Sequence, residues 1–332
     1  MKIVVADLNE RGIFRPIDEI LGNRNVPNDT GLSNRLLVWE LVKIINNIHN
    51  NKFEIIIDIK QNPETNNCVN LEDTKVKDVT KIDFSNYIPL TDKMIQDIFN
   101  GSLKLDNDKN YFTDFTKRHI HDFVKNYPTR FIKDLKFIND EINDGIKKVV
   151  QGCIGIHLRR GRGVRINDGN TIDLSLFEGW NHDILSDYIK MKVNDMPAWK
   201  HYQFDFIKDE VYFEKIDAIL AKSPNQKFYI SHDLDYSMFN CNANQRWLDK
   251  YSKNLVWKED FYELLTSWEI PLELNTKNFL DLYALCNTRH IFTVPLSTWS
   301  ELASDYNGKM GMDINSISNK DLLRKVYQKN LL

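Results

Sequence analysis

Strand-like and helix-like stretches alternate along this chain, and this alternation constrains its fold more than any other feature. Runs of strand length, rich in β-branched or aromatic residues, recur at 2–8, 53–59, 153–158, 227–231 and 290–294. Apolar residues at helical spacing lie between them, from Leu36 to Ile48 and over 206–221, 279–286 and 297–304. Parallel strands need a long crossover connection, usually a helix, so this order predicts parallel sheets in an α/β protein.

Other parts of the chain give weaker patterns. Residues 61–110 are polar, rich in Asn and Asp, and predict no particular element. Helical periodicity is present over 110–127, 131–150 and 257–265. No internal repeat or low-complexity linker is visible, and the most natural division lies near residue 150. We therefore predict two α/β domains, residues 1–150 and 151–332, with a cleft between them.

Composition excludes some classes of partner. The formal net charge is −3, which does not support binding to nucleic acid or to a membrane surface. No apolar run reaches the roughly 18 residues of a membrane-spanning helix, and the first residues lack the pattern of a signal peptide. The 4 cysteines are far apart, without the spacing of metal ligands, which favours free thiols in a reducing compartment. We expect a cytoplasmic protein with no integral membrane segment.

The strand at 153–158 leads into the most informative motif. Its last two residues are His157 and Leu158, and Arg159, Arg160 and two glycines follow. The planar, permanently charged guanidinium suits bidentate contacts with phosphate, and ligands of open α/β sheets bind beyond the carboxyl ends of strands. The motif predicts a phosphate or diphosphate site, although a solvated basic turn packed against acidic neighbours would carry the same residues.

Three further segments have residues suited to a nucleotide ligand. Asp233 follows an apolar strand and could accept hydrogen bonds from a nucleobase or a sugar hydroxyl. Ser297 and Thr298 stand where a helix begins, and its free N–H groups would accept a phosphate, although both residue types are also ordinary helix caps. Gly31 and Asn34 precede or open the first long helix and could reach a ligand.

Taken in order, these segments resemble motifs of the fucosyltransferase superfamily, which includes α1,6-, α1,2-, nodulation-type and protein O-fucosyltransferases. Gly31–Asn34 is similar to an early Gly-x-(Gly)-Asn segment. His157, Arg159 and Arg160 match a His-x-Arg-Arg strand end. Ile230–Asp233 resembles a strand that ends in Ala-Thr-Asp, and Leu285–Ser300 resembles a late segment with a Ser-(Thr/Ser)-(Phe/Trp)-Ser motif. The order and spacing of the motifs carry the resemblance.

The resemblance implies a GT-B-like architecture of two Rossmann-like domains, with residues 1–150 on the acceptor side and residues 151–332 binding the nucleotide sugar. It implies GDP-fucose as donor, a glycan hydroxyl as acceptor, and inversion at the anomeric carbon with no metal or other cofactor. Arg159 and Arg160 would neutralise the charge that develops on the departing diphosphate. The contacts with the nucleotide would come from His157, Asp233, Ser297, Thr298, Asn34 and Gly31.

The sequence also departs from the family pattern. Arg162 stands where the family often has an acidic residue, so the base that deprotonates the acceptor is not identified by position. Asp168 is the first candidate, followed by Asp173 and Glu178. An extra residue precedes Ser297, which makes a GDP-sugar better supported than fucose itself.

Two other interpretations stay open. Asp233 and Asp235 form an Asp-x-Asp motif, which in many nucleotide-sugar transferases holds a divalent cation against a diphosphate. Asp235 would equally suit a turn cap. The chain would then be a metal-dependent transferase. A non-catalytic glycan-binding protein of the same fold is the other interpretation, because 7 Trp and 13 Tyr suit stacking on sugars as well as packing in a core.

Overall fold

The structure is a computed structural model of the chain, with mixed α and β elements. It describes residues 1–6, 32–58, 69–71, 73–77, 79, 82–114, 124–158, 209–232, 242–272, 274–294, 297–306, 308 and 311–327. Two five-stranded sheets are parallel at every described strand pair, as the alternating pattern predicts. A short antiparallel pair, β3 (Val69–Asn70) and β7 (Lys136–Phe137), stands apart from them. No helix within these ranges is long and apolar enough to cross a membrane.

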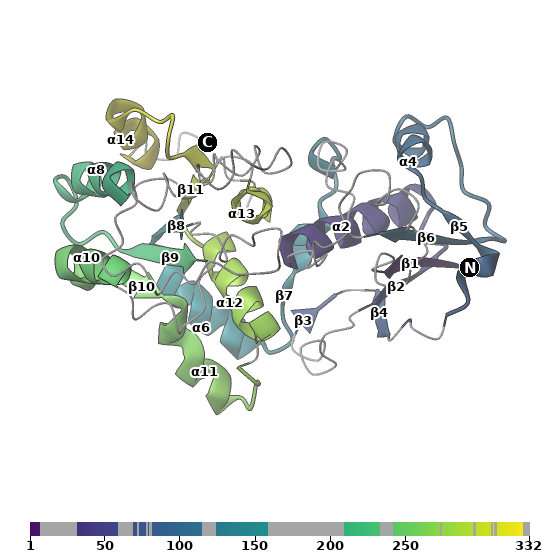
Figure 1. Cartoon of the computed structure of the whole chain (residues 1–332), viewed down its shortest axis with the longest axis horizontal. Helices are drawn as coiled ribbons and strands as arrows, with labels where there is room; N and C mark the ends of the chain where they lie inside the picture. Colours follow the sequence, from purple (N-terminus) through teal and green to yellow (C-terminus); the bar gives the residue numbers. More distant parts are fainter. Residues whose placement is uncertain are drawn as a thin grey trace, which may run out of the picture. The chain divides into compact units, whose positions relative to one another are not determined.

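The chain divides into two compact units (Figure 1). Unit 1 comprises Met1–Asn143 and Leu264–Phe279, and unit 2 comprises Asp144–Glu263 and Leu280–Leu332. Three helices contain the points where the chain passes between units: α6 (Asp140–Val150), α11 (Tyr262–Ser267) and α12 (Leu274–Cys286). Each unit therefore combines segments that are distant in sequence.

Unit 1 is built on a sheet with the strand order β4-β2-β1-β6-β5. Its strands are β1 (Lys2–Ala6), β2 (Glu54–Asp58), β4 (Thr74–Lys77), β5 (Tyr87–Pro89) and β6 (Asn110–Asp114). In the middle of the sheet, Ile3, Val4 and Val5 of β1 are all fully buried, because parallel strands covered on both faces need apolar side chains on both. The helices are α2 (Leu32–Ile48) and α4 (Asp92–Phe99).

Helix α2 is fixed by polar contacts as well as by its apolar face. Glu40 is fully buried and accepts hydrogen bonds from the guanidinium of Arg130, Nε to Oε1 at 2.8 Å and Nη2 to Oε2 at 3.0 Å. The same carboxylate accepts from the backbone N–H of Ile132 at 3.2 Å. At the other end, His49 Nε2 accepts from the N–H of Leu105 at 2.8 Å. These contacts connect α2 to segments about 60 to 90 residues away in sequence.

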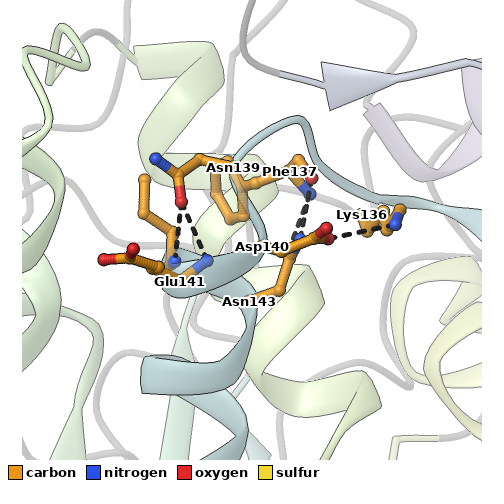
Figure 2. A network of polar contacts seen from close by, with 7 residues as sticks. Lys136, Phe137, Asn139, Asp140, Glu141 and Asn143 are labelled. Atoms are coloured by element: carbon orange, nitrogen blue, oxygen red, sulfur yellow. Dashed lines mark hydrogen bonds and ion pairs between the residues drawn. The ribbon is translucent and has the colours of Figure 1, made fainter.

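The start of α6 is specified by two asparagines (Figure 2). Asn139 caps the helix, because its Oδ1 accepts from the N–H groups of Glu141 and Ile142 at 2.8 and 3.2 Å. Asn143 is buried and bonds both backbone groups of Phe137, accepting at 2.9 Å and donating at 2.8 Å. The amide of Asn143 therefore joins α6 to β7.

Unit 2 has a sheet with the order β10-β9-β8-β11-β12. Its strands are β8 (Ile154–Leu158), β9 (Phe228–His232), β10 (Leu255–Trp257), β11 (His290–Thr293) and β12 (Met312–Asp313). Its other helices are α8 (Asp209–Leu220), α10 (Asn242–Tyr251), α13 (Thr298–Tyr306) and α14 (Asn319–Tyr327).

The two faces of this sheet differ in chemistry. One face, with Ile156 and Ile230, packs in an apolar core with buried side chains of α8, α10 and α14, the three helices on one side of the strands in Figure 1. On the other face, Gly155 lies so close to α12 that a Cβ there would be 2.6 Å from Leu285 Cδ1. Side chains alternate between faces along a strand, so His157 and Ser231 share the face of Gly155. Tyr229 shares that face as well, whereas His232 lies on the apolar face with Leu158.

Some predicted elements need correction. The helix predicted over 110–127 is wrong at its start, because Asn110–Asp114 forms β6. Tyr111, Phe112 and Thr113 are buried on alternate faces of the sheet, and aromatic and β-branched residues favour that environment. Over 131–150 only α6 is an α-helix, and the helical stretch predicted from Trp257 begins instead with the last residue of β10. The strands at 53–59 and 227–231 and the helices at 279–286 and 297–304 are confirmed, each within a few residues.

Candidate functional site

The strand order of unit 2 marks one position at the edge of its sheet. From β8 the chain builds β9 and β10 on one side, then returns to add β11 and β12 on the other. The next strands after β8 and β11, which are β9 and β12, therefore lie on opposite sides of this central pair. In open α/β sheets, ligands bind at this switch point, beyond the carboxyl ends of the strands.

Two of the predicted site residues meet here. His157 is the penultimate residue of β8 and is 3% exposed, and Ser297 is fully buried directly before α13. Ser297 Oγ lies 3.4 Å from His157 Nδ1. The carbonyl of His157 accepts a hydrogen bond from the hydroxyl of Tyr212 at 3.0 Å, which ties the end of β8 to α8. The structure thus joins the end of β8 to the start of α13, residues separated by 140 positions.

The first turn of α13 is held firmly at this place. Val294 N–H donates to Ser300 Oγ at 3.2 Å, and Glu301 N–H donates to the Ser297 carbonyl at 3.1 Å. Helix α13 therefore begins directly after the serine, as the sequence predicts. The N–H groups that open a helix have no partners within it, and the helix dipole adds positive potential, so this end suits an anion.

Several predicted residues lie outside the described part of the chain: Arg159, Arg160, Asp168, Asp173, Glu178, Asp233, Asp235 and Gly31. Asn34 and Thr298 have described backbone in α2 and α13, while their side chains are outside it. The register pairs Leu158 with His232, the last residues of β8 and β9. Arg159 and Asp233 are the next residues in the sequence after these two strand ends, and their roles remain predictions.

Sequence reasoning missed a buried polar network next to His157. Tyr229 Oη donates to Asp281 Oδ1 at 2.8 Å, and Ser231 Oγ donates to Asp281 Oδ2 at 3.0 Å. Ser231 Oγ in turn accepts from Trp299 Nε1 at 3.0 Å. Ser231 lies directly beside His157 in the sheet register. The one signal in the sequence was a carboxylate, Asp281, within the apolar stretch 279–286 of the helix.

The Asp281 carboxyl is electrostatically unusual. It is 2% exposed, and burial raises its pKa to about 6, although Lys258 and the two hydroxyl donors favour the charged form. Burial and the neighbouring Asp281 raise the pKa of Tyr229 well above its usual range, so that phenol stays a donor. A carboxyl with a pKa near neutrality, beside the switch point, is typical of a functional site and also of a structural network.

The described residues do not form a metal centre. No group of three or more His, Cys, Asp or Glu among them could hold a metal ion. Cys153 and Cys286 are buried free thiols, and burial raises the pKa of Cys153 to about 11. The chemistry that the described site offers is therefore hydrogen bonding and a helix N-terminus.

Comparison with known proteins finds likenesses among solved structures and none by sequence. No protein-family model matches the sequence, and no curated protein matches it. Solved structures that resemble the chain include the crystal structure of POFUT1 in complex with GDP. The two chains are 10% identical, and the match covers 93% of this chain and 95% of that chain with a TM-score of 0.35. A likeness at this identity and TM-score establishes neither a shared fold nor a shared activity.

Proposed function

We propose that this chain is a glycosyltransferase that binds a nucleoside-diphosphate sugar at the carboxyl edge of the sheet of unit 2. The observation that carries the proposal is the meeting of His157 and Ser297 at the switch point between β8 and β11. The start of α13 supplies an anion-binding helix terminus at the same place. The sequence continues from β8 directly into Arg159 and Arg160.

These groups suit the chemistry of glycosyl transfer. When the bond between sugar and diphosphate breaks, negative charge develops on the leaving diphosphate, and preorganised donors stabilise it. Cationic guanidinium groups from Arg159 and Arg160 and the N–H groups of α13 would provide that stabilisation without a metal ion. His157 and Asp233 would contact the nucleoside, while Ser297 and Thr298 would contact the diphosphate.

The finer assignment rests on the resemblance to the fucosyltransferase superfamily. It comprises a GT-B architecture, GDP-fucose as donor, inversion at the anomeric carbon and a glycan hydroxyl as acceptor. Two units, each with a parallel five-stranded sheet, suit a GT-B enzyme. Asp168 would be the base that deprotonates the acceptor. Among these assignments, a GDP-sugar donor has more support than fucose.

Calorimetry with GDP, UDP, CMP and their sugars tests the proposal. We expect GDP to bind, and Arg160→Ala to weaken binding at least tenfold, because a charged hydrogen bond contributes about 1.5–3 kcal/mol. Arg324→Ala is the matched control, since Arg324 is an exposed arginine on α14 of the same unit, and it should bind GDP like the unaltered protein. Selective binding of UDP would overturn the donor assignment.

The metal requirement is tested separately, by turnover of GDP-fucose with a panel of glycan acceptors. We expect activity to persist in EDTA, with release of GDP. Loss of activity in EDTA and its return with Mn²⁺ would instead favour a metal-dependent site at Asp233 and Asp235. Binding of GDP-sugars and glycans without any turnover would favour a non-catalytic protein.

A further inference from the structure

The first turn of α13 is docked on two adjacent residues of the sheet. Ser297, directly before the helix, contacts His157 on β8. Trp299, the second residue of the helix, donates from its indole Nε1 to Ser231 Oγ on β9 at 3.0 Å. His157 and Ser231 are register partners, side by side in the sheet. Two contacts at neighbouring positions fix both the place and the direction of the helix start.

The hydrogen bond from Trp299 to Ser231 belongs to a chain of hydrogen bonds that ends at the buried Asp281. Ser231 is fully buried, and its hydroxyl has one proton, which it donates to Asp281 Oδ2 at 3.0 Å. Its oxygen therefore accepts from the indole while its proton is committed to the carboxylate. A hydroxyl that donates to a carboxylate is a better acceptor for its second partner, because hydrogen bonds in a chain polarise one another. Asp281 is itself anchored by Tyr229 at 2.8 Å.

We propose that Trp299 and Ser231 are positioning residues that hold the N-terminus of α13 in place for the diphosphate of the nucleotide. The inference rests on the proposed function. Neither residue touches the ligand in this role. Trp299 fixes the helix start by donating to the Ser231 hydroxyl, and the Asp281 carboxylate orients that hydroxyl. In this proposal the helix terminus contacts phosphate. Loss of the indole hydrogen bond should therefore weaken binding of the phosphates of the ligand and leave binding of the nucleoside unchanged.

Trp299→Phe tests this directly, because it removes the N–H donor and keeps an aromatic ring. Calorimetry with GDP and with guanosine measures both parts of the ligand. We expect Trp299→Phe to weaken GDP binding about threefold to tenfold, the net effect of one hydrogen bond, and to leave guanosine binding unchanged. Ser231→Ala removes the same contact from the other side and should give the same pattern.

The chain offers a matched control in Trp247. This tryptophan is fully buried in unit 2, whereas Trp299 is partly buried, and the indole Nε1 of Trp247 makes no hydrogen bond within the described structure. It packs in the apolar core on the opposite face of the sheet. Trp247→Phe therefore makes the same chemical change without removing a hydrogen bond, and we expect the folded variant to bind GDP and guanosine like the unaltered protein.

The outcomes separate the inference from the proposed function. If the unaltered protein binds neither GDP nor guanosine, the proposed function fails and the inference fails with it. If it binds GDP and Trp299→Phe binds equally well, the inference alone is wrong. Equal weakening of GDP and guanosine would show a general distortion of unit 2, which also overturns a positioning role for the phosphates.

Discussion

Each unit buries a carboxylate on one of its helices, but the partners differ. In unit 1, Glu40 of α2 is fully buried against the guanidinium of Arg130, with both oxygens bonded at 2.8 and 3.0 Å. In unit 2, Asp281 of α12 is 2% exposed and bonded to two neutral hydroxyls, those of Tyr229 and Ser231. The positive charge of Lys258 also favours the ionised form of Asp281.

The two sets of partners give the two carboxylates different roles. The charged partner makes Glu40 a structural anchor, whereas the neutral partners of Asp281 allow burial to raise its pKa. A bidentate guanidinium compensates the buried charge in place and fixes the path of residues 130–132 against α2. Hydroxyl donors compensate less, so burial raises the pKa of Asp281 to about 6. Asp281 also lies beside the switch point, through Ser231, whereas Glu40 serves the packing of α2. We therefore expect changes at Glu40 to alter stability and changes around Asp281 to alter binding as well.

The largest expected effect comes from breaking the pair in unit 1. Glu40→Gln removes the fully buried carboxylate that pairs with the Arg130 guanidinium, whose side chain is 11% exposed. Removing one partner of a buried ion pair typically costs about 3–5 kcal/mol, so we expect a loss of that size in the free energy of unfolding, measured with urea.

Asp140→Asn is the control for this substitution. Asp140 pairs with Lys136 at 3.1 Å, but its side chain is 75% exposed, and exposed pairs contribute about 0.5 kcal/mol or less. Similar losses for the two variants would contradict the view that Glu40 is a buried structural anchor.

The second effect is a pH dependence that belongs to unit 2. The pKa of Asp281 is about 6 in the folded protein against an ordinary value of 3.8, so the folded state binds the proton more tightly. The stability from this group is fully present below about pH 3.8 and is lost as the pH rises through about 6. The shift corresponds to about 3 kcal/mol in the free energy of unfolding.

Asp281→Asn isolates this contribution. We expect the stability of the variant relative to the unaltered protein to rise between pH 4 and pH 7, because the variant has no proton to lose at this position. Urea titrations of both proteins across that range measure the difference, which cancels the contributions of all other titrating groups. A difference that stays constant with pH would show that Asp281 has the same pKa in both states.

Much of the fold follows from local sequence patterns, because burial on both faces of a parallel strand demands runs such as Lys2–Ala6 and Phe228–His232. The sequence predicts helix where β6 lies, because Tyr111–Thr113 is too short a run to distinguish the periodicity of a strand from that of a helix. The strand order of either sheet could not be predicted from the sequence, because it depends on contacts between distant segments. The return of β11 to the side of β8 is the clearest example.

The site was predictable where a motif sits at the end of an element. His157 and Ser297 each border a strand or a helix, and the structure brings them together. Asp281 was not predictable as a site residue, because its role depends on its two partners on β9, Tyr229 and Ser231, and on Trp299 of α13, which donates to Ser231. A single carboxylate in an apolar helix signals burial, and its partners become visible only with the tertiary contacts.

The smallest expected change in stability comes from the close approach of α12 to the sheet, which brings Asp281 within reach of Ser231. In unit 1 the central strand β1 has no glycine, whereas β8 has Gly155 opposite Leu285, one helical turn from Asp281 on α12. A Cβ at position 155 would lie 2.6 Å from Leu285 Cδ1 and 2.7 Å from Thr288 Oγ1. Gly155→Ala should therefore cost about 1–3 kcal/mol in the free energy of unfolding.

Gly152→Ala is the control, because a Cβ at position 152 meets no atom within 4 Å. This variant should have unchanged or slightly raised stability. Equal stability of the two variants would mean that α12 can move away from β8 without cost, and Asp281 would then lose the close packing that keeps its carboxyl buried.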